Sequence, residues 1–205
     1  MANVLYSYVV DHDHGRSPNP ESGFCTLVHC MHKKKGGKDN IVEKAQVGDW
    51  IMGTGGLSKD SAGHGKIIYL MRVDEKIPFK DFLVDPRFNG RWDQRDDHHG
   101  NQWALVSSHF HYFGQDALSI AQLPRSLRTL QLEKRGPRYR RDLPEDKVLA
   151  LTQWMAENQP FGKSGEPCAP LSAHKNCVPT CVTPGCDDTC QATRPTSVEK
   201  SRSSC

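Results

Sequence analysis

Residues 4–10 form the run VLYSYVV, and this run decides how the chain begins to fold. It is short and rich in β-branched and aromatic residues, so it predicts a buried or half-buried strand. Other segments of similar composition also predict strands: Cys25–His29, Trp50–Met52, Lys66–Val73, and a long strand from Ala104 to Phe113. The chain therefore contains several short strands.

Helical signals are fewer. Asp142-Leu143-Pro144-Glu145 predicts the start of a helix with Asp142 as its N-cap. An apolar stripe follows in this helix, formed by Val148, Leu151, Trp154 and Met155. Because strands outnumber helices, we expect an α+β fold with a curled or barrel-like, mostly antiparallel sheet and a few short helices.

The composition of the chain changes near residue 162. A chain of 205 residues fits one domain with an appended tail, and the mean hydropathy of −0.65 is at the polar end for globular proteins. We expect a domain over residues 1–161 and a Cys/Pro/Ser-rich tail over residues 162–205. No apolar run is long enough to span a membrane and no secretion signal is visible, so we expect a cytoplasmic protein with no membrane partner.

The tail contains the residue types that bind zinc. Four ligands suffice for a structural zinc ion, and zinc binding would supply folding energy that so polar a segment lacks. The candidate ligands are His174, Cys177, Cys181, Cys186 and Cys190. A disordered tail is the alternative interpretation, and beyond this zinc the cofactor is unknown.

The net charge of +3 for the whole chain says little about partners, but the charge is unevenly distributed. Basic residues concentrate between Leu123 and Asp142, with only two acidic residues among them. They are Arg125, Arg128, Lys134, Arg135, Arg138, Arg140 and Arg141. Because a guanidinium group matches the paired oxygens of a phosphate, this segment predicts phosphate binding, with a solvated loop as the alternative.

Histidines and acidic residues gather at residues 11–14, at residues 96–99, and at His109 with His111. A strand would place His109 and His111 on one face, about 7 Å apart, where loops could add further ligands to a hydrolytic metal site. Polar loops collect such residues for solubility as well. Two further patterns stay open: Cys25 as a nucleophile or a small buried residue, and Gly53–Gly56 as a phosphate-binding loop or a plain turn.

Several ordered motifs resemble a known family, the nucleotide modification associated domain, type two. They are Tyr6–Val10, Asp11, Gly15, Pro18-Asn19-Pro20, Cys25–Leu27, Cys30, Val47–Gly55, Ile67–Val73, Asp85–Phe88, Phe110–Gly114 and Arg135-Gly136. The resemblance extends from residue 4 to about residue 160. It implies a prokaryotic or phage protein encoded among systems that modify DNA bases.

A looser likeness concerns the fold alone. The segment Lys44–Ile51 is similar to the entry into the barrel of PUA-like domains, including EVE domains, which read modified bases. If the likeness holds, the loops after the first strand and after Met52 would surround one pocket.

Three functions are compatible with these patterns. The first is nucleic-acid or nucleotide binding through a modified or flipped base, with the arginine segment on the phosphates. The base-binding candidates are Tyr6, Tyr8, Asn19, Trp50, Tyr112 and Phe113. The second is an enzyme that modifies or removes a DNA base, with Asp11 or Asp49 as general base or oxocarbenium stabiliser. The third is an interaction protein that recruits a partner through its tail.

Overall fold

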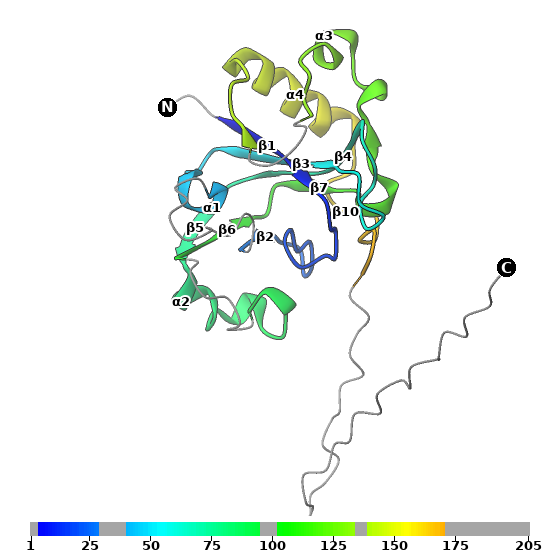
Figure 1. Ribbon diagram of the computed structural model, residues 1–205. Helices are drawn as coiled ribbons and strands as arrows, with labels where there is room; N and C mark the ends of the chain where they lie inside the picture. Colours follow the sequence, from blue (N-terminus) through cyan, green and yellow to red (C-terminus); the bar gives the residue numbers. More distant parts are fainter. Residues whose placement is uncertain (1–3, 29–39, 95–101, 134–138, 171–205) are drawn as a thin grey trace, which may run out of the picture. The chain divides into compact units, whose positions relative to one another are not determined.

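The computed structural model describes residues 4–28, 40–94, 102–133 and 139–170 (Figure 1). These residues build two β-sheets with few helices, which confirms the mixed α and β composition predicted from the sequence. Among them, no helix is long and apolar enough to cross a membrane.

The larger sheet has seven strands in the order β10-β7-β4-β3-β1-β9, with β8 paired to β4. Its strands are β1 (Leu5–Val10), β3 (Trp50–Gly55), β4 (Lys66–Arg72), β7 (Phe110–Tyr112), β8 (Leu118–Ser119), β9 (Tyr139–Arg140) and β10 (Gly162–Lys163). The pairs β1–β3 and β10–β7 are parallel, and the other pairs are antiparallel. Most strand pairs are thus antiparallel, as the sequence predicted.

The smaller sheet is antiparallel, with the order β2 (Cys25–Leu27), β6 (Trp103–Ser107) and β5 (Glu75–Pro78). The predicted long strand from Ala104 to Phe113 is wrong, because the chain turns at Ser108–His109 and places β6 and β7 in different sheets. Asp74 closes this turn by accepting hydrogen bonds from the backbone N–H groups of Ser108 (2.7 Å) and His109 (3.1 Å). The apolar pattern continues across the turn, so it gave no sign of the break.

The helices are short, except for one. They are α1 (Ile41–Lys44), α2 (Phe79–Phe82), α3 (Arg125–Arg128) and α4 (Glu145–Asn158). Asp142 is not the N-cap of α4, as the sequence predicted. Pro144 occupies the cap position without a side-chain hydrogen bond, and Asp142 accepts a hydrogen bond from Arg140 Nε at 2.7 Å instead.

Both faces of the larger sheet are covered. Along β1, the side chain of Leu5 packs with α3 and α4, whereas Tyr6 and Tyr8 pack on the opposite face with residues of the smaller sheet. This alternation is the period of two expected of a strand. Figure 1 shows α3 and α4 on one side of β1, β3 and β4, and the smaller sheet with α2 on the other. A third apolar cluster, which includes Phe82 and Phe88, fills the space beyond the smaller sheet.

The sheet is not a closed barrel. In the described residues the two-residue strands β9 and β10 form its two edges, and no pairing joins them. The expectation of a barrel-like sheet is therefore wrong in this respect. Because separate layers cover both faces, the apolar side chains are buried without closure of the sheet.

Gly53 and Gly55 lie within β3 and allow close packing there. A Cβ on Gly53 would collide with the ring of Tyr69 on β4, and one on Gly55 would collide with the backbone of Gly63. Both glycines are buried, and both pair with β1. Close approach of neighbouring chain segments explains these residues without a phosphate ligand.

A buried polar cluster ties the loop after β1 to the rest of the domain. Asp93 is 0% exposed and lies 3.2 Å from Nε of Arg91, which is itself buried. The Asp93 carboxylate also accepts hydrogen bonds from Asn19 Nδ2 (2.9 Å) and from the hydroxyl of Thr26 on β2. Arg91 donates to the backbone carbonyls of Asn19 and Glu21, both at 2.8 Å. One guanidinium group thus holds the loop against β2.

Replacing Asp93 tests this cluster. We expect Asp93→Ala to lower the free energy of unfolding by about 3–5 kcal/mol, because it leaves a buried guanidinium without its counter-charge. Urea denaturation followed by circular dichroism measures the change. The control is Asp142→Ala at the exposed Arg140 pair, expected to cost at most about 1 kcal/mol. Equal losses in both variants would contradict the assignment.

Candidate functional site

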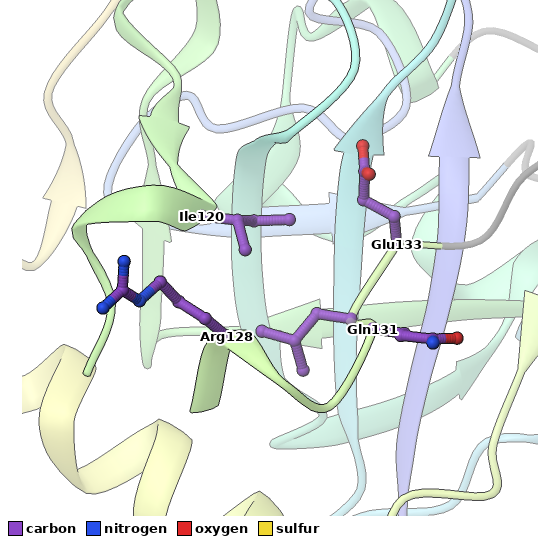
Figure 2. Close-up of a pocket in the computed structure, with 5 residues that line it drawn as sticks. Ile120, Arg128, Gln131 and Glu133 are labelled. Atoms are coloured by element: carbon purple, nitrogen blue, oxygen red, sulfur yellow. The ribbon is translucent and has the colours of Figure 1, made fainter. Parts of the chain in front are cut away.

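The arginine segment borders a hollow of about 580 Å³ on the surface of the domain. Its lining comes from the 3₁₀ turn η4 (Ile120–Gln122), from α3 and from the segment that follows α3. The lining residues are Ile120, Arg128, Gln131, Leu132 and Glu133. Figure 2 shows Arg128 on one side of this hollow and Glu133 on the other. We call it the Arg128 hollow.

Helix α3 presents its two arginines to solvent because its apolar residue points inward. Leu127 is buried in the core with residues of α4, whereas Arg125 and Arg128 are exposed. Within the described part of the chain, no carboxylate forms an ion pair with either arginine. As far as these residues are concerned, both exposed guanidinium groups could pair with an external anion.

The segment after α3 is held in place from two sides. Gln131 adopts the left-handed backbone conformation at φ 48°, which is uncommon outside glycine. Arg140 on β9 donates from Nη1 to the carbonyl oxygens of Leu130 (3.0 Å) and Gln131. The hydroxyl of Ser7 on β1 donates to the carbonyl of Leu132 at 2.6 Å. These bonds fix the wall of the hollow.

The polar side chains of this wall offer both kinds of hydrogen-bonding group. The Gln131 amide supplies a donor and an acceptor, and an ionised Glu133 carboxylate supplies acceptors only. Glu133 already accepts a hydrogen bond from the backbone N–H of Gly65 and lies 3.7 Å from Nδ1 of His64. Its position is thus set by a loop from elsewhere in the chain.

The remaining residues of the predicted phosphate segment have other positions. The Nε and Nη1 groups of Arg140 are engaged with Asp142 and with backbone carbonyls, so this residue braces the segment. Arg141 is exposed and interacts with the hydroxyl of Tyr6, opposing the rise in the pKa of Tyr6 that burial causes. Lys134, Arg135 and Arg138 lie outside the described residues.

The predicted aromatic walls do not line the Arg128 hollow. Tyr6, Tyr8, Tyr112 and Phe113 are buried in the core, where the hydroxyls of Tyr8 and Tyr69 lie 2.8 Å apart. Trp50 is half-buried and lines a different hollow of about 450 Å³, together with Arg72 and residues of α4. The aromatic residues and the arginines of α3 are therefore not gathered around one cavity.

The polar candidates from the sequence lie in three places. Asn19 is buried in the Arg91–Asp93 cluster, where its side chain is bonded to Asp93. Asp49 is buried and accepts hydrogen bonds from the backbone N–H groups of Val4 (3.0 Å) and Gln46 (2.8 Å), which joins the residue before β1 to the turn before β3. Asp11 is exposed at the end of β1.

The expectation that one strand places His109 and His111 on the same face is wrong. His109 is exposed in the turn and lies 3.1 Å from Asp74, whereas His111 is buried and bonded to the carbonyl of Pro160 at 2.8 Å. Burial lowers the pKa of His111, although its bond to Pro160 opposes this effect. Residues 96–99 and the tail ligands His174, Cys177, Cys181, Cys186 and Cys190 lie outside the described residues.

Of the two interpretations of Cys25, the structure supports the small buried residue. Its thiol is fully buried in the core, and this burial raises its pKa. A raised pKa keeps the thiol protonated, and a protonated thiol is a poor nucleophile.

A third hollow, of about 380 Å³, lies against the loop after β1. Residues 14–22, 89–92 and 166–170 contribute to its lining, including His14, Asn19 and Arg91. We call it the loop hollow.

Sequence reasoning missed Arg91 and Gln131, because a buried arginine in a polar stretch and a left-handed glutamine carry no spacing signal.

Residues 1–102 match the family described as nucleotide modification associated domain 2. The resemblance predicted from the sequence is thereby confirmed, and this half of the chain belongs to that family. The motifs between residues 110 and 160 lie beyond the match, and the PUA-like likeness stays a prediction. No curated protein and no solved structure matches the chain. The family connects the chain with nucleotide modification.

The turn at Asp74 predicts a defined acid dependence. Burial opposes ionisation of Asp74, but hydrogen bonds from Arg72, His109 and Ser108 outweigh it and lower its pKa to about 2. Because this pKa is below the ordinary value of 3.8, the stabilisation is complete above about pH 4 and is lost as the pH falls towards 2. The stability difference between the parent and Asp74→Asn should therefore narrow over this range.

Urea unfolding at a series of pH values measures the difference. Asp146→Asn, at an exposed carboxylate on α4, is the control and should differ little from the parent at any pH. A gap between the parent and Asp74→Asn that stays constant from pH 6 to pH 2 would contradict the prediction.

Proposed function

We propose that the chain is a nucleic-acid- or nucleotide-binding module that acts in nucleotide modification. It holds phosphates on α3 and a modified or flipped base in the Arg128 hollow. The observation that carries this proposal is the position of two arginines without carboxylate partners in the described residues, on a helix that borders a hollow of about 580 Å³. The family match supports the nucleotide as the class of ligand.

Phosphate is the anion that suits this surface. Arg125 and Arg128 lie three residues apart on one helix, so their side chains project from neighbouring positions. A guanidinium group donates paired hydrogen bonds to phosphate oxygens and keeps its charge at every physiological pH. Adjacent phosphates of one strand, or of one nucleotide, supply the matching acceptors.

The hollow suits a base by size and by chemistry. Small-molecule sites commonly have volumes of about 300–1,000 Å³, and this hollow lies within that range. The half-buried Ile120 offers apolar surface to the face of a base. The Gln131 amide can bond to a donor and an acceptor on its edge, and Glu133 can accept from an exocyclic amino group. Phosphate contacts would thus give affinity, and contacts to the base edge would give selectivity.

Substituting the two exposed arginines tests the proposal. We expect Arg125→Ala/Arg128→Ala to weaken the binding of single-stranded DNA at least tenfold at low salt. The slope of log affinity against log salt should also fall by about one for each lost phosphate contact. Fluorescence anisotropy with labelled oligonucleotides at several salt concentrations measures both. Gln131→Ala should change the preference among oligonucleotides that carry different modified bases, with a smaller effect on the salt slope.

Arg87→Ala is the matched control, because Arg87 is an arginine already paired with Glu75 and Asp85. It should leave DNA affinity unchanged. DNA affinity that is unchanged in Arg125→Ala/Arg128→Ala would disprove the role of α3. A loss of DNA affinity in Arg87→Ala would disprove it as well. If DNA affinity depends on salt but is the same for all modified bases, the binding is unspecific phosphate attraction and the base-binding part of the proposal is wrong.

A further inference from the structure

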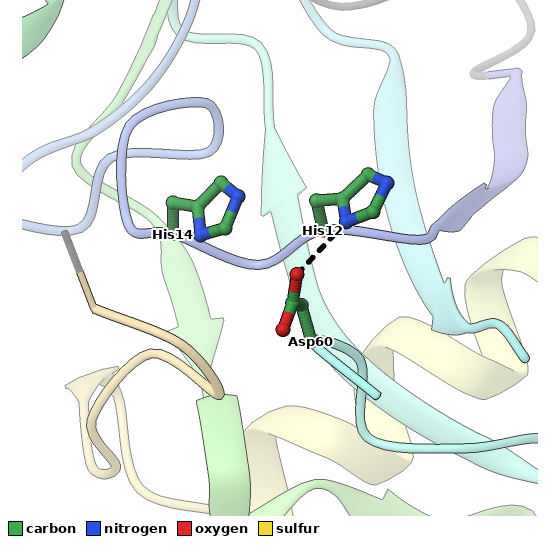
Figure 3. Close-up of side chains that lie close together, drawn as sticks. All are labelled: His12, His14 and Asp60. Atoms are coloured by element: carbon green, nitrogen blue, oxygen red, sulfur yellow. Dashed lines mark hydrogen bonds and ion pairs between the residues drawn. The ribbon is translucent and has the colours of Figure 1, made fainter. Parts of the chain in front are cut away.

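The loop after β1 contains a cluster of potential metal ligands outside the Arg128 hollow. One ring nitrogen of His12, one of His14 and one carboxylate oxygen of Asp60 all lie within 4.8 Å of one another. Figure 3 shows the two imidazoles side by side on one segment, with Asp60 facing them from another loop. We propose that these three residues bind a divalent transition-metal ion such as Zn²⁺.

The distances fit such an ion with small movements. Ligand atoms around a tetrahedral zinc lie about 3.4 Å apart, given metal–ligand bonds of about 2.0–2.1 Å. Nδ1 of His12 is already 3.3 Å from Oδ2 of Asp60. The rings of His12 and His14 are nearly parallel, with an interplanar angle of 11° and centroids 5.8 Å apart. Because the side chain of His12 is 61% exposed, it can rotate to close the remaining gap.

The alternation of the backbone brings the two histidines together. His12 and His14 flank Asp13, whose side chain points inward and is 1% exposed. Its carboxylate accepts hydrogen bonds from the hydroxyl of Tyr112 (2.7 and 2.9 Å) and from the backbone N–H of Cys168 (3.2 Å). An inward Asp13 directs its two neighbours outward on the same side. The buried Asp13 side chain therefore fixes the positions of the two histidines.

The loop that contains Asp60 is anchored to the same strand end. The backbone N–H of Asp13 donates to the carbonyl of Asp60 at 2.9 Å, which places this residue next to the histidines. One position further on, the hydroxyl of Ser61 donates to the carbonyl of Val10 at 2.6 Å and accepts from the N–H of Gly56 at 2.8 Å. Preorganised ligands lower the cost of gathering them around an ion.

The surroundings of His14 select the form of imidazole that binds metals. Nδ1 of His14 lies 2.7 Å from the carbonyl oxygen of Ala169. A carbonyl only accepts hydrogen bonds, so Nδ1 has the proton and the neutral ring keeps its lone pair on Nε2. Metal-binding histidines commonly donate their other ring N–H to such a carbonyl, which fixes the tautomer and the ring orientation.

Two imidazoles and one carboxylate form a ligand set that leaves coordination positions open. Catalytic zinc sites use three protein ligands of these types and keep the fourth position for water or substrate. His14 also lines the loop hollow of about 380 Å³, so a group bound there would lie beside the ion. All three ligands belong to residues 1–102, the part of the chain that matches the family. The metal site is independent of the nucleotide-binding proposal.

Direct metal binding tests the site. The competing ligands of the tail are first removed from the full-length chain by His174→Ala with Cys177→Ser, Cys181→Ser, Cys186→Ser and Cys190→Ser. We expect this background protein to bind one Zn²⁺ per chain in calorimetric titration. X-ray absorption of the bound zinc should show nitrogen and oxygen ligands only. His12→Ala and Asp60→Asn, each added to this background, should weaken Zn²⁺ binding at least tenfold.

The control is His109→Ala, because His109 is an exposed histidine beside Asp74 without a third ligand among the described residues. It should bind Zn²⁺ as the background does. Thermal unfolding in a chelator should give the same midpoint for His12→Ala and the background, which shows that the fold is intact. Added Zn²⁺ should raise the midpoint of the background and of His109→Ala, but not that of His12→Ala. Unchanged affinity in both ligand variants, sulfur ligation, or loss of binding in His109→Ala would overturn the proposal.

Discussion

The loop after β1 depends on one buried carboxylate, that of Asp13, which anchors it to the core of the domain. Asp13 is almost fully buried, and its oxygens accept hydrogen bonds from Tyr112 on β7 and from the backbone of Cys168. Burial and the neighbouring Asp13 carboxylate raise the pKa of Tyr112, so its hydroxyl stays protonated and remains a donor. The Asp13 oxygens have hydrogen-bond donors inside the protein. A shift of the chain by one residue would exchange inward and outward side chains, and the loss of these hydrogen bonds opposes such a shift.

A second constraint acts on the same loop from its other end. The guanidinium group of Arg91 bonds to the carbonyls of Asn19 and Glu21 and pairs with buried Asp93. The loop is thus held at residue 13 by a carboxylate and at residues 19–21 by an arginine, and the loop hollow lies beside it. Fixed ends of this kind let polar residues occupy a defined surface without strand or helix geometry of their own.

The sequence predicted the strands that have a clear apolar pattern, including β1, β3 and β4. It also placed α4, because the stripe of Val148, Leu151 and Met155 repeats at the helical period. It failed at Ser108–His109, where alternation continues through a turn that a distant residue, Asp74, closes. The arginines of α3 were found from charge alone. Gln131 was not found, because its left-handed backbone leaves no pattern in the sequence. Asp60 was not found either, because only the fold brings it next to His12.

The sequence by itself determined the family of the N-terminal half, the mixed α and β composition and the position of the basic segment, because these follow from local residue types and their order. The tertiary structure decided which aromatic residues are core and which arginines are exposed without a carboxylate partner among the described residues. It also decided which histidines face a carboxylate. These properties depend on contacts between segments far apart in the chain, such as Asp13 with Tyr112 and Ser7 with Leu132. Such contacts form only when the two faces of the larger sheet are covered, and no local pattern specifies them.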